Sequence, residues 1–515
     1  MVRWDGDDWL SGLAFDWDID TASSTVSKGF ATADGIDPFR RPGYAMPGTF
    51  PIDITTVSVI DAIQKNAAVY LQYAFTVGGT KMHQLDLTNN TLTNNATFPK
   101  TVSAHGGHNS VSASDIILYY IGTTRYGFYS WSDNADGDVG RYDLATTFDD
   151  DYMSTVAASG AVLSTTYAHP MVVGADDILY IADGRKLHGF DGQTGANGTF
   201  SAARLTLPTD YIITSFAKTG DRLVIFAYKA SASYSNSKYR SEATAFFWDY
   251  VSEDTDKVVP LNSNYVNGGF SYKGTIGCFT QGQAATLNAD KQSRLVLFTG
   301  SVFEPLVAFV DDIPGFGGVE VCDNTIYWNS EGKIYQYGSP HIGMNNVMNR
   351  VSALAGTTGE GMLKNLSNNN LIGSAGTTTS GGLQRMQTGY YPASFSMPFV
   401  DIPTPYDKYA RITKVRVHWY RTTEASCNTI NLNLQYDGGA WGEDVIEESG
   451  YVGNSRQSPP ANPAPLISLY ETTYNAKSFS LATSVSVNVT YTASNQTKRP
   501  AIIKSIEVYY TYENI

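Results

Sequence analysis

The stretch Asp177-Ile178-Leu179-Tyr180-Ile181-Ala182-Asp183-Gly184-Arg185-Lys186-Leu187-His188-Gly189-Phe190-Asp191 contains an apolar run after a polar turn, then a Gly turn, then a second alternating run. Turn residues between two runs of period two are the signature of a β-hairpin. A Gly turn followed by a basic residue and an alternating run returns at Gly79–Asp86 and at Gly332–Tyr337. The stretch therefore predicts a hairpin that recurs along the chain.

An apolar strand that starts from a polar turn occurs six times. The six instances begin at Asn66, Asp115, Asp177, Asp221, Arg294 and Asp323. The first and last are 257 residues apart, so the mean spacing is about 51 residues, although single gaps range from 29 to 73. This mean is close to the length of a four-stranded propeller blade, and such units bury their apolar faces only against neighbours. A β-propeller of about six blades is predicted over residues 51–350, with an irregular stack of β-sandwiches as the alternative.

The remaining parts of the chain differ from this repeat. Residues 1–50 are expected to form an N-terminal extension. Residues 351–389 are rich in Gly, Ser, Thr and Asn, and such a stretch buries too little apolar area to order itself, so it is predicted to be a linker or an interface loop. Residues 390–515 hold four alternating runs, which predict a C-terminal antiparallel β-sandwich of jelly-roll type.

The overall composition agrees with an all-β protein. Hydrophobic residues make up 42% of the 515 residues, aromatic residues 13% and charged residues 16%. This balance favours half-buried strands over charged amphipathic helices. The net charge of −14 would repel duplex phosphate, so we expect nucleic acid to pass such a surface rather than bind to it.

Several features bear on where the protein is made. Three distant cysteines do not suggest a disulfide framework, and the acidic start of the chain lacks the basic and apolar regions of a secretory signal. No window approaches the 18 apolar residues of a membrane span. Synthesis in a cytoplasm and no membrane association are therefore expected.

The chain shows no constellation that would support catalysis. A nucleophile elbow, a phosphate-binding loop and a dinucleotide fingerprint are all missing from the sequence. Sialidases and glycosidases are propeller enzymes, but the blade motif common in sialidases does not occur here, and many acidic residues make any carboxylate pair uninformative. We expect no enzyme activity, no catalytic residues and no cofactor.

Two segments resemble metal-binding sequences without completing one. Asp133, Asp136 and Asp138 suggest an acidic calcium loop, yet they do not follow the alternation of the EF-hand and no bidentate Glu follows. They are weak calcium candidates, and an acidic hairpin tip is the simpler interpretation. His105 and His108 form a close pair, which is an incomplete metal site.

A resemblance to a known family rests on layout. The entry segment Pro38–Gly48, the strands of the Asp177–Tyr180 type and the opening Lys408–Ile412 of the sandwich resemble propeller proteins of tailed bacteriophages. They are most similar in style to the tail nozzle and packaged-DNA-stabilisation proteins of short-tailed phages. The resemblance implies a ring of subunits, commonly six, below the portal and adaptor, around the channel through which the genome leaves. It implies no catalytic residues.

The expected function is accordingly that of a structural virion protein in the tail nozzle or adaptor ring. Its expected partners are other virion proteins of the portal, adaptor or tail and further copies of itself, commonly six in all as the resemblance implies. A capsid-decorating protein, a tail fibre or an adhesin that binds host surface glycan is the alternative. For an adhesin, Trp419 and Trp441 are the candidate glycan-binding residues, although strand packing explains them as well.

Overall fold

A computed structural model represents the chain and describes most of its strands. The described residues are 1–5, 30, 32–34, 36–37, 44–45, 50–54, 64–89, 91–97, 112–133, 136–158, 162–229, 242–282, 293–309, 311–322, 325–339, 347–354, 363–365, 371–377, 380–387, 393–397, 399–406, 408–421, 429–436, 439–440, 446–447, 468–475, 481–482, 484–492 and 502–514. The chain divides into two compact units, one of Met1–Pro51, Lys333–Ala353 and Met386–Ile515 and the other of Ile52–Gly332 and Leu354–Arg385. Strands dominate both, which confirms the predicted all-β class.

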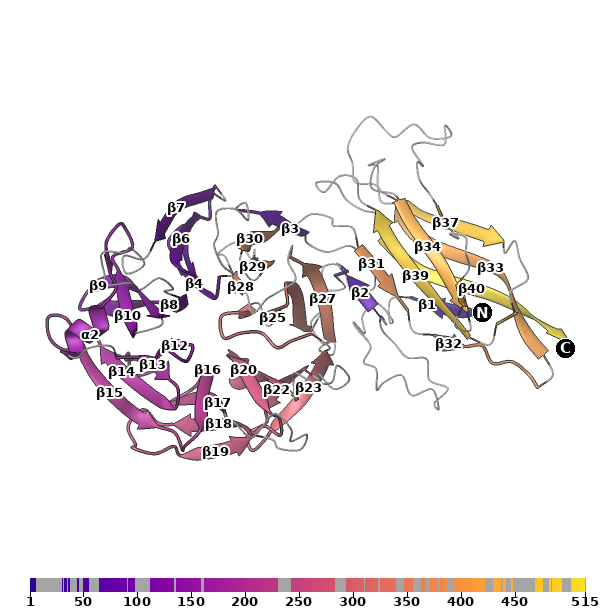
Figure 1. Cartoon of the computed structure of the whole chain (residues 1–515). Helices are drawn as coiled ribbons and strands as arrows, with labels where there is room; N and C mark the ends of the chain where they lie inside the picture. The colour runs from indigo at the N-terminus through magenta and orange to yellow at the C-terminus, as the bar shows by residue number, and fades with distance from the viewer. Residues whose placement is uncertain are drawn as a thin grey trace. The chain divides into compact units, whose positions relative to one another are not determined.

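Seven four-stranded antiparallel sheets form the blades of a β-propeller (Figure 1). The first six sheets are each made of four consecutive strands. These strands are β4 (Asn66–Tyr70), β5 (Tyr73–Gly78), β6 (Lys81–Asp86), β7 (Thr91–Thr97); β8 (Ser112–Ile121), β9 (Thr124–Ser132), β10 (Gly137–Tyr142), β11 (Phe148–Asp149); β12 (Met171–Val173), β13 (Leu179–Asp183), β14 (Lys186–Asp191), β15 (Thr199–Thr206); β16 (Tyr211–Thr219), β17 (Arg222–Lys229), β18 (Ala243–Trp248), β19 (Lys257–Pro260); β20 (Tyr265–Tyr272), β21 (Thr275–Gln281), β22 (Ser293–Phe298), β23 (Phe303–Phe309); and β24 (Val319–Cys322), β25 (Thr325–Ser330), β26 (Lys333–Gly338), β27 (Val347–Ala353). A short helix, α2 (Tyr152–Ala157), follows the second sheet.

The seventh sheet combines strands from both sides of the other six. Its strands are β28 (Leu363–Asn365), β29 (Leu371–Thr377), β30 (Ser380–Gln387) and β3 (Phe50–Asp53), in that order. The first strands of successive blades contact one another from β4 through β28, and β28 contacts β4 again. The ring is therefore closed by a blade that shares strands from before the first blade and after the sixth.

The predicted propeller is confirmed, and it has seven blades where the recurring strands gave a count of about six. Each of the six recurring strands lies in a different one of the first six blades, as β4, β8, β13, β17, β22 and β25. They are the first strand in two blades, the second in three and the third in one, which explains the uneven spacing. The seventh blade contains no such strand, so counting them missed it.

The segment 351–389, predicted to be a linker or interface loop, instead contains the strands β28, β29 and β30. Ile372 and Leu383 are fully buried and pack with Ala67, Ala74 and Leu85 of the first blade. The few apolar residues of this segment suffice because a neighbouring blade supplies the rest of the apolar surface.

Gly turns begin the third strands, as the hairpin motif predicted. Gly79, Gly184 and Gly332 have φ values of +62°, +58° and +80°. Glycine adopts this backbone region without a Cβ clash, which two-residue hairpin loops require.

Two further sheets form the β-sandwich. One has the order β1-β40-β33-β37 with β38 beside β33, and the other has the order β2-β31-β39-β34-β35 with β32 beside β39 and β36 beside β34. The strands are β1 (Val2–Trp4), β2 (Thr32–Asp34), β31 (Ala393–Ser396), β32 (Val400–Asp401), β33 (Lys408–Arg421), β34 (Thr429–Tyr436), β35 (Gly439–Ala440), β36 (Ile446–Glu447), β37 (Ser468–Asn475), β38 (Leu481–Ala482), β39 (Ser484–Thr492) and β40 (Ile502–Asn514). The main strands from β33 onward alternate between the sheets, as a jelly-roll-like sandwich requires.

The prediction of a separate N-terminal extension at residues 1–50 needs correction. Strands β1 and β2 belong to the two sandwich sheets, and Trp4 is fully buried in their common core. Short edge strands far apart in sequence from their partners give no local signal of this pairing.

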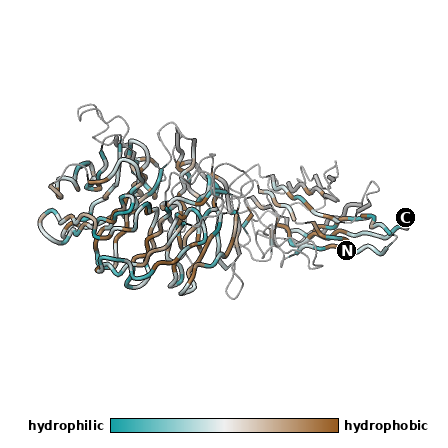
Figure 2. The backbone as a smooth tube through the Cα atoms, turned by 60° about the horizontal axis from the view of Figure 1, so that its bottom comes forward, coloured by the Kyte–Doolittle hydropathy of each residue, from teal (hydrophilic) through white to brown (hydrophobic). Residues whose placement is uncertain are grey.

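Hydrophobic stretches run along the strands in both units, as the brown segments in Figure 2 show.

Candidate functional site

A cavity of about 420 Å³ lies where the first strands of the blades converge. Its wall includes residues of β4, β8, β12 and β16, together with Gly269, Phe316 and Lys364. Most of these side chains are apolar, and the charged ones among the described lining residues are Asp115 and Lys364. The central cavity therefore combines an apolar wall with two opposite charges.

Asp115 joins the first three blades at this cavity. Its Oδ1 accepts hydrogen bonds from Asn66 Nδ2 of β4 at 2.5 Å and from the Ile116 N–H at 2.7 Å. Its Oδ2 accepts from the Met171 N–H of β12 at 2.7 Å. Burial raises the pKa of Asp115 to about 6, although these donors and the charge of Lys364 oppose the rise. At neutral pH the carboxylate is therefore ionised and engaged by three donors.

Lys364 of β28 is the other charged group in the cavity wall. Its Nζ lies 3.9 Å from Oε2 of Glu320 on β24, and the two side chains are 25% and 23% exposed. A hydrogen-bonded ion pair between an ammonium and a carboxylate is closer, at about 2.7–2.9 Å. The ammonium therefore has a neighbouring charge without a tight pair.

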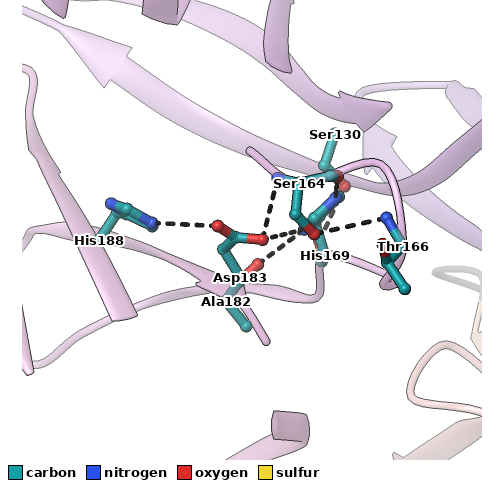
Figure 3. A network of polar contacts seen from close by, with 7 residues as sticks. All are labelled: Ser130, Ser164, Thr166, His169, Ala182, Asp183 and His188. Carbon is teal, nitrogen blue, oxygen red and sulfur yellow. Dashed lines mark hydrogen bonds and ion pairs between the residues drawn. The ribbon is translucent and has the colours of Figure 1, made fainter. Parts of the chain in front are cut away.

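A second polar network lies inside the third blade (Figure 3). Asp183 Oδ1 is 3.8 Å from Nδ1 of His169, and Oδ2 is 3.7 Å from Nε2 of His188. The Ser164 N–H also donates to Oδ1 at 3.0 Å. Burial alone would raise the pKa of Asp183, but His188 and the Ser164 N–H outweigh it and hold the pKa at about 2. Asp183 is thus a fixed negative charge between two imidazoles.

His169 links this network to the second blade. Its ring nitrogens lie 3.0 Å (Nδ1) from the Ala182 carbonyl oxygen and 2.9 Å (Nε2) from the Ser164 carbonyl oxygen. Its own carbonyl accepts a hydrogen bond from Ser130 Oγ of β9 at 2.7 Å. Burial lowers the pKa of His169. The imidazole therefore lies between two main-chain carbonyls, and the carbonyl of His169 contacts the second blade.

The network does not have the geometry of an activated nucleophile. A histidine base must accept a hydrogen bond from the hydroxyl that it activates. Here Nε2 of His169 faces the carbonyl of Ser164, whose hydroxyl accepts instead from the Thr166 N–H at 3.4 Å. Serine, histidine and aspartate therefore meet here as structural groups.

The calcium candidates have different partners in the structure. Asp133 Oδ1 accepts a hydrogen bond from the Asp136 N–H at 2.7 Å, so these two residues form a local turn. Asp138 Oδ1 accepts from the Val139 N–H at 2.7 Å and from the Ser154 N–H of α2 at 3.2 Å. Within the described part of the chain, no three His, Cys, Asp or Glu side chains are grouped to hold a metal ion.

Other candidate residues divide between the core and the undescribed part of the chain. Trp419 is 6% exposed and belongs to the sandwich core, so its ring is no open platform for a sugar. The burial of Trp419 on β33 favours strand packing, the other interpretation of this residue, over glycan binding. Trp441, His105 and His108 lie outside the described residues.

Sequence reasoning did not single out Asp115, Lys364 or His169. In the sequence Asp115 is only the polar residue that starts a repeating strand, and its partner Met171 is 56 residues away. Lys364 lies in the segment predicted to be a linker or interface loop. Such groups meet only because the ring closes.

No helix in the described ranges is long and apolar enough to cross a membrane.

Comparison with known proteins finds only distant similarities. No family model and no curated protein matches the chain. Among solved structures, Drosophila Semaphorin 1a extracellular domains 1–2 is 9% identical, with a TM-score of 0.41, 65% of this chain covered and 88% of that chain. The Dos1 propeller is 10% identical, with a TM-score of 0.39 and coverages of 70% and 98%. The sheet order itself establishes that this chain is a β-propeller combined with an antiparallel β-sandwich.

Proposed function

We propose that this protein is a structural component of a tailed-bacteriophage particle, a subunit of the nozzle or adaptor ring around the DNA-exit channel. The observation that carries the proposal is how the buried charged groups are used. Asp115 and Asp183 accept hydrogen bonds from groups on other strands and loops. Groups held in this way stabilise a fixed architecture, which suits an assembled particle better than turnover.

The layout of the chain supports the same proposal. Strands before and after the propeller complete one sandwich, and strands from both sides also complete the seventh blade. A subunit built in this way resists opening, because distant segments of the chain complete both the sandwich and the seventh blade. That property suits a part that must remain assembled while a genome passes.

Charge supports passage of DNA without tight binding. Residues 51–350 contain 19 Lys and Arg against 29 Asp and Glu, a net charge of −10. Such a surface repels the phosphates of DNA. It also offers few Lys and Arg side chains that could displace the counterions of DNA. The adhesin alternative has less support, because Trp419 is buried.

The test is mass photometry of the purified protein, followed by negative-stain class averages of any oligomer. We expect rings with a central channel wide enough for duplex DNA, six subunits being the number that the resemblance implies. A strictly monomeric or trimeric protein would contradict ring formation by this chain. Binding on a glycan array would then favour the capsid-decorating, fibre or adhesin alternative.

A further inference from the structure

The central cavity has the volume of a small-molecule site. Its volume of about 420 Å³ falls within the roughly 300–1,000 Å³ of typical ligand pockets. Residues such as Val69, Ile117 and Phe316 supply apolar surface, and the wall also includes the polar residues Asn66, Asp115, Ser215 and Lys364. A ligand that fills this space can therefore bury an apolar body and still make polar contacts.

Asp115 is unsuited to recognise such a ligand. Its two carboxylate oxygens accept hydrogen bonds from Asn66, Ile116 and Met171. A ligand cation that competed for these oxygens would leave buried N–H groups without partners, at a cost of about 1–3 kcal/mol each. The negative charge in the wall is thus committed to holding three blades together.

Lys364 is suited to bind a ligand. Its ammonium carries three N–H donors, and its distance of 3.9 Å from Glu320 is longer than a hydrogen bond. The side chain lines the cavity and is 25% exposed, so solvent reaches the group. An anion that displaces this solvent would gain charge-assisted hydrogen bonds from the ammonium.

We propose that the central cavity binds a small organic anion with an apolar body, whose carboxylate or sulfonate contacts Lys364 and whose body packs against Val69, Ile117 and Phe316. This inference is independent of the proposed virion role. Lys364 belongs to the seventh blade, and the apolar wall belongs mainly to the first three. A bound ligand therefore connects the closing blade to the others and stabilises the closed ring by mass action.

The probe for the test is 8-anilinonaphthalene-1-sulfonate, an aromatic body with one sulfonate. With the full-length protein we expect saturable binding at one site per chain. Lys364→Met should weaken binding by about tenfold or more, because a charge-assisted hydrogen bond is lost. Lys218→Met is the matched control, since Lys218 is exposed on β16 and does not line the cavity.

Two further measurements locate the site and its charge preference. Val69→Phe should reduce binding by filling the cavity, and near-UV circular dichroism would verify that each variant remains folded. Decanoate should compete with the probe and raise the melting temperature, whereas decanol should do neither. Unchanged probe binding by Lys364→Met or Val69→Phe would overturn the proposal, as would equal competition by decanol or the absence of a saturable site. None of these results depends on whether the protein forms rings.

Discussion

At the scale of single residues, Asp115 carries the largest predicted effect on stability. Asp115→Ala removes the acceptor of three N–H donors from two neighbouring blades and its own strand. Because buried donors without partners are costly, we expect a loss of about 3 kcal/mol or more in the free energy of unfolding. Urea denaturation measures the loss, with Asp221→Ala at an exposed position as the control. Equal midpoints for the two variants would contradict this role of Asp115.

Asp138 gives a prediction about pH. Burial raises the pKa of Asp138 to about 7 in the folded protein, against 3.8 for an exposed carboxyl, although hydrogen bonds from Ser154 and Val139 oppose the rise. A raised folded-state pKa contributes stability that is complete below pH 4 and is lost as the pH rises through 7. Asp138→Asn keeps an acceptor oxygen for both N–H groups and has no proton to lose. Relative to the wild type, its free energy of unfolding should rise by on the order of 2–4 kcal/mol from pH 4 to pH 8. Denaturation at both pH values checks this, and a constant difference would contradict it.

At the scale of elements, the seventh blade depends on the strand that precedes the first blade. The Ile54 N–H, next to β3, donates to the Leu383 carbonyl of β30 at 2.9 Å. Ile54→Pro removes this donor and should weaken the pairing of β3 with β30. We expect a lower melting temperature and faster proteolysis within residues 355–392, whereas Ile54→Val, which keeps the N–H, should resemble the wild type. Identical proteolysis of the two variants would show that β3 does not close the blade.

At the scale of the whole molecule, the sandwich is assembled from distant segments of the chain. Trp4 of β1 is fully buried in a core that also contains Val415, Val487 and Ile506. Trp4→Ala should cost about 3–5 kcal/mol by leaving a cavity. Hydrogen exchange followed by mass spectrometry should show faster exchange in residues 393–421 and 484–514, with the propeller peptides unchanged. Arg3→Gln, at a half-exposed neighbour, serves as the control, and protected sandwich peptides in Trp4→Ala would contradict the role of β1.

Local sequence patterns predict the hairpins of the blades but not the contacts of the candidate sites. The turn chemistry of Gly184 and Gly332 is local, so the hairpins could be predicted from the sequence. The contact between Asp115 and Met171 spans 56 residues, and Lys364 reaches the cavity only through a blade that lacks the repeating apolar strand. Pairing between distant segments depends on the complementary surfaces that they present to one another. A short window of sequence contains only one of these surfaces, so it cannot predict the pairing.

The sequence by itself determined the all-β class, the propeller and the C-terminal sandwich, because alternation of period two and Gly turns act over a few residues. Only the tertiary structure decided that there are seven blades, that residues 363–387 form the seventh with β3, and that β1 and β2 belong to the sandwich. In each of these cases a short or apolar-poor segment becomes a strand because a neighbouring strand satisfies its hydrogen bonds and a neighbouring blade or sheet covers its apolar side chains.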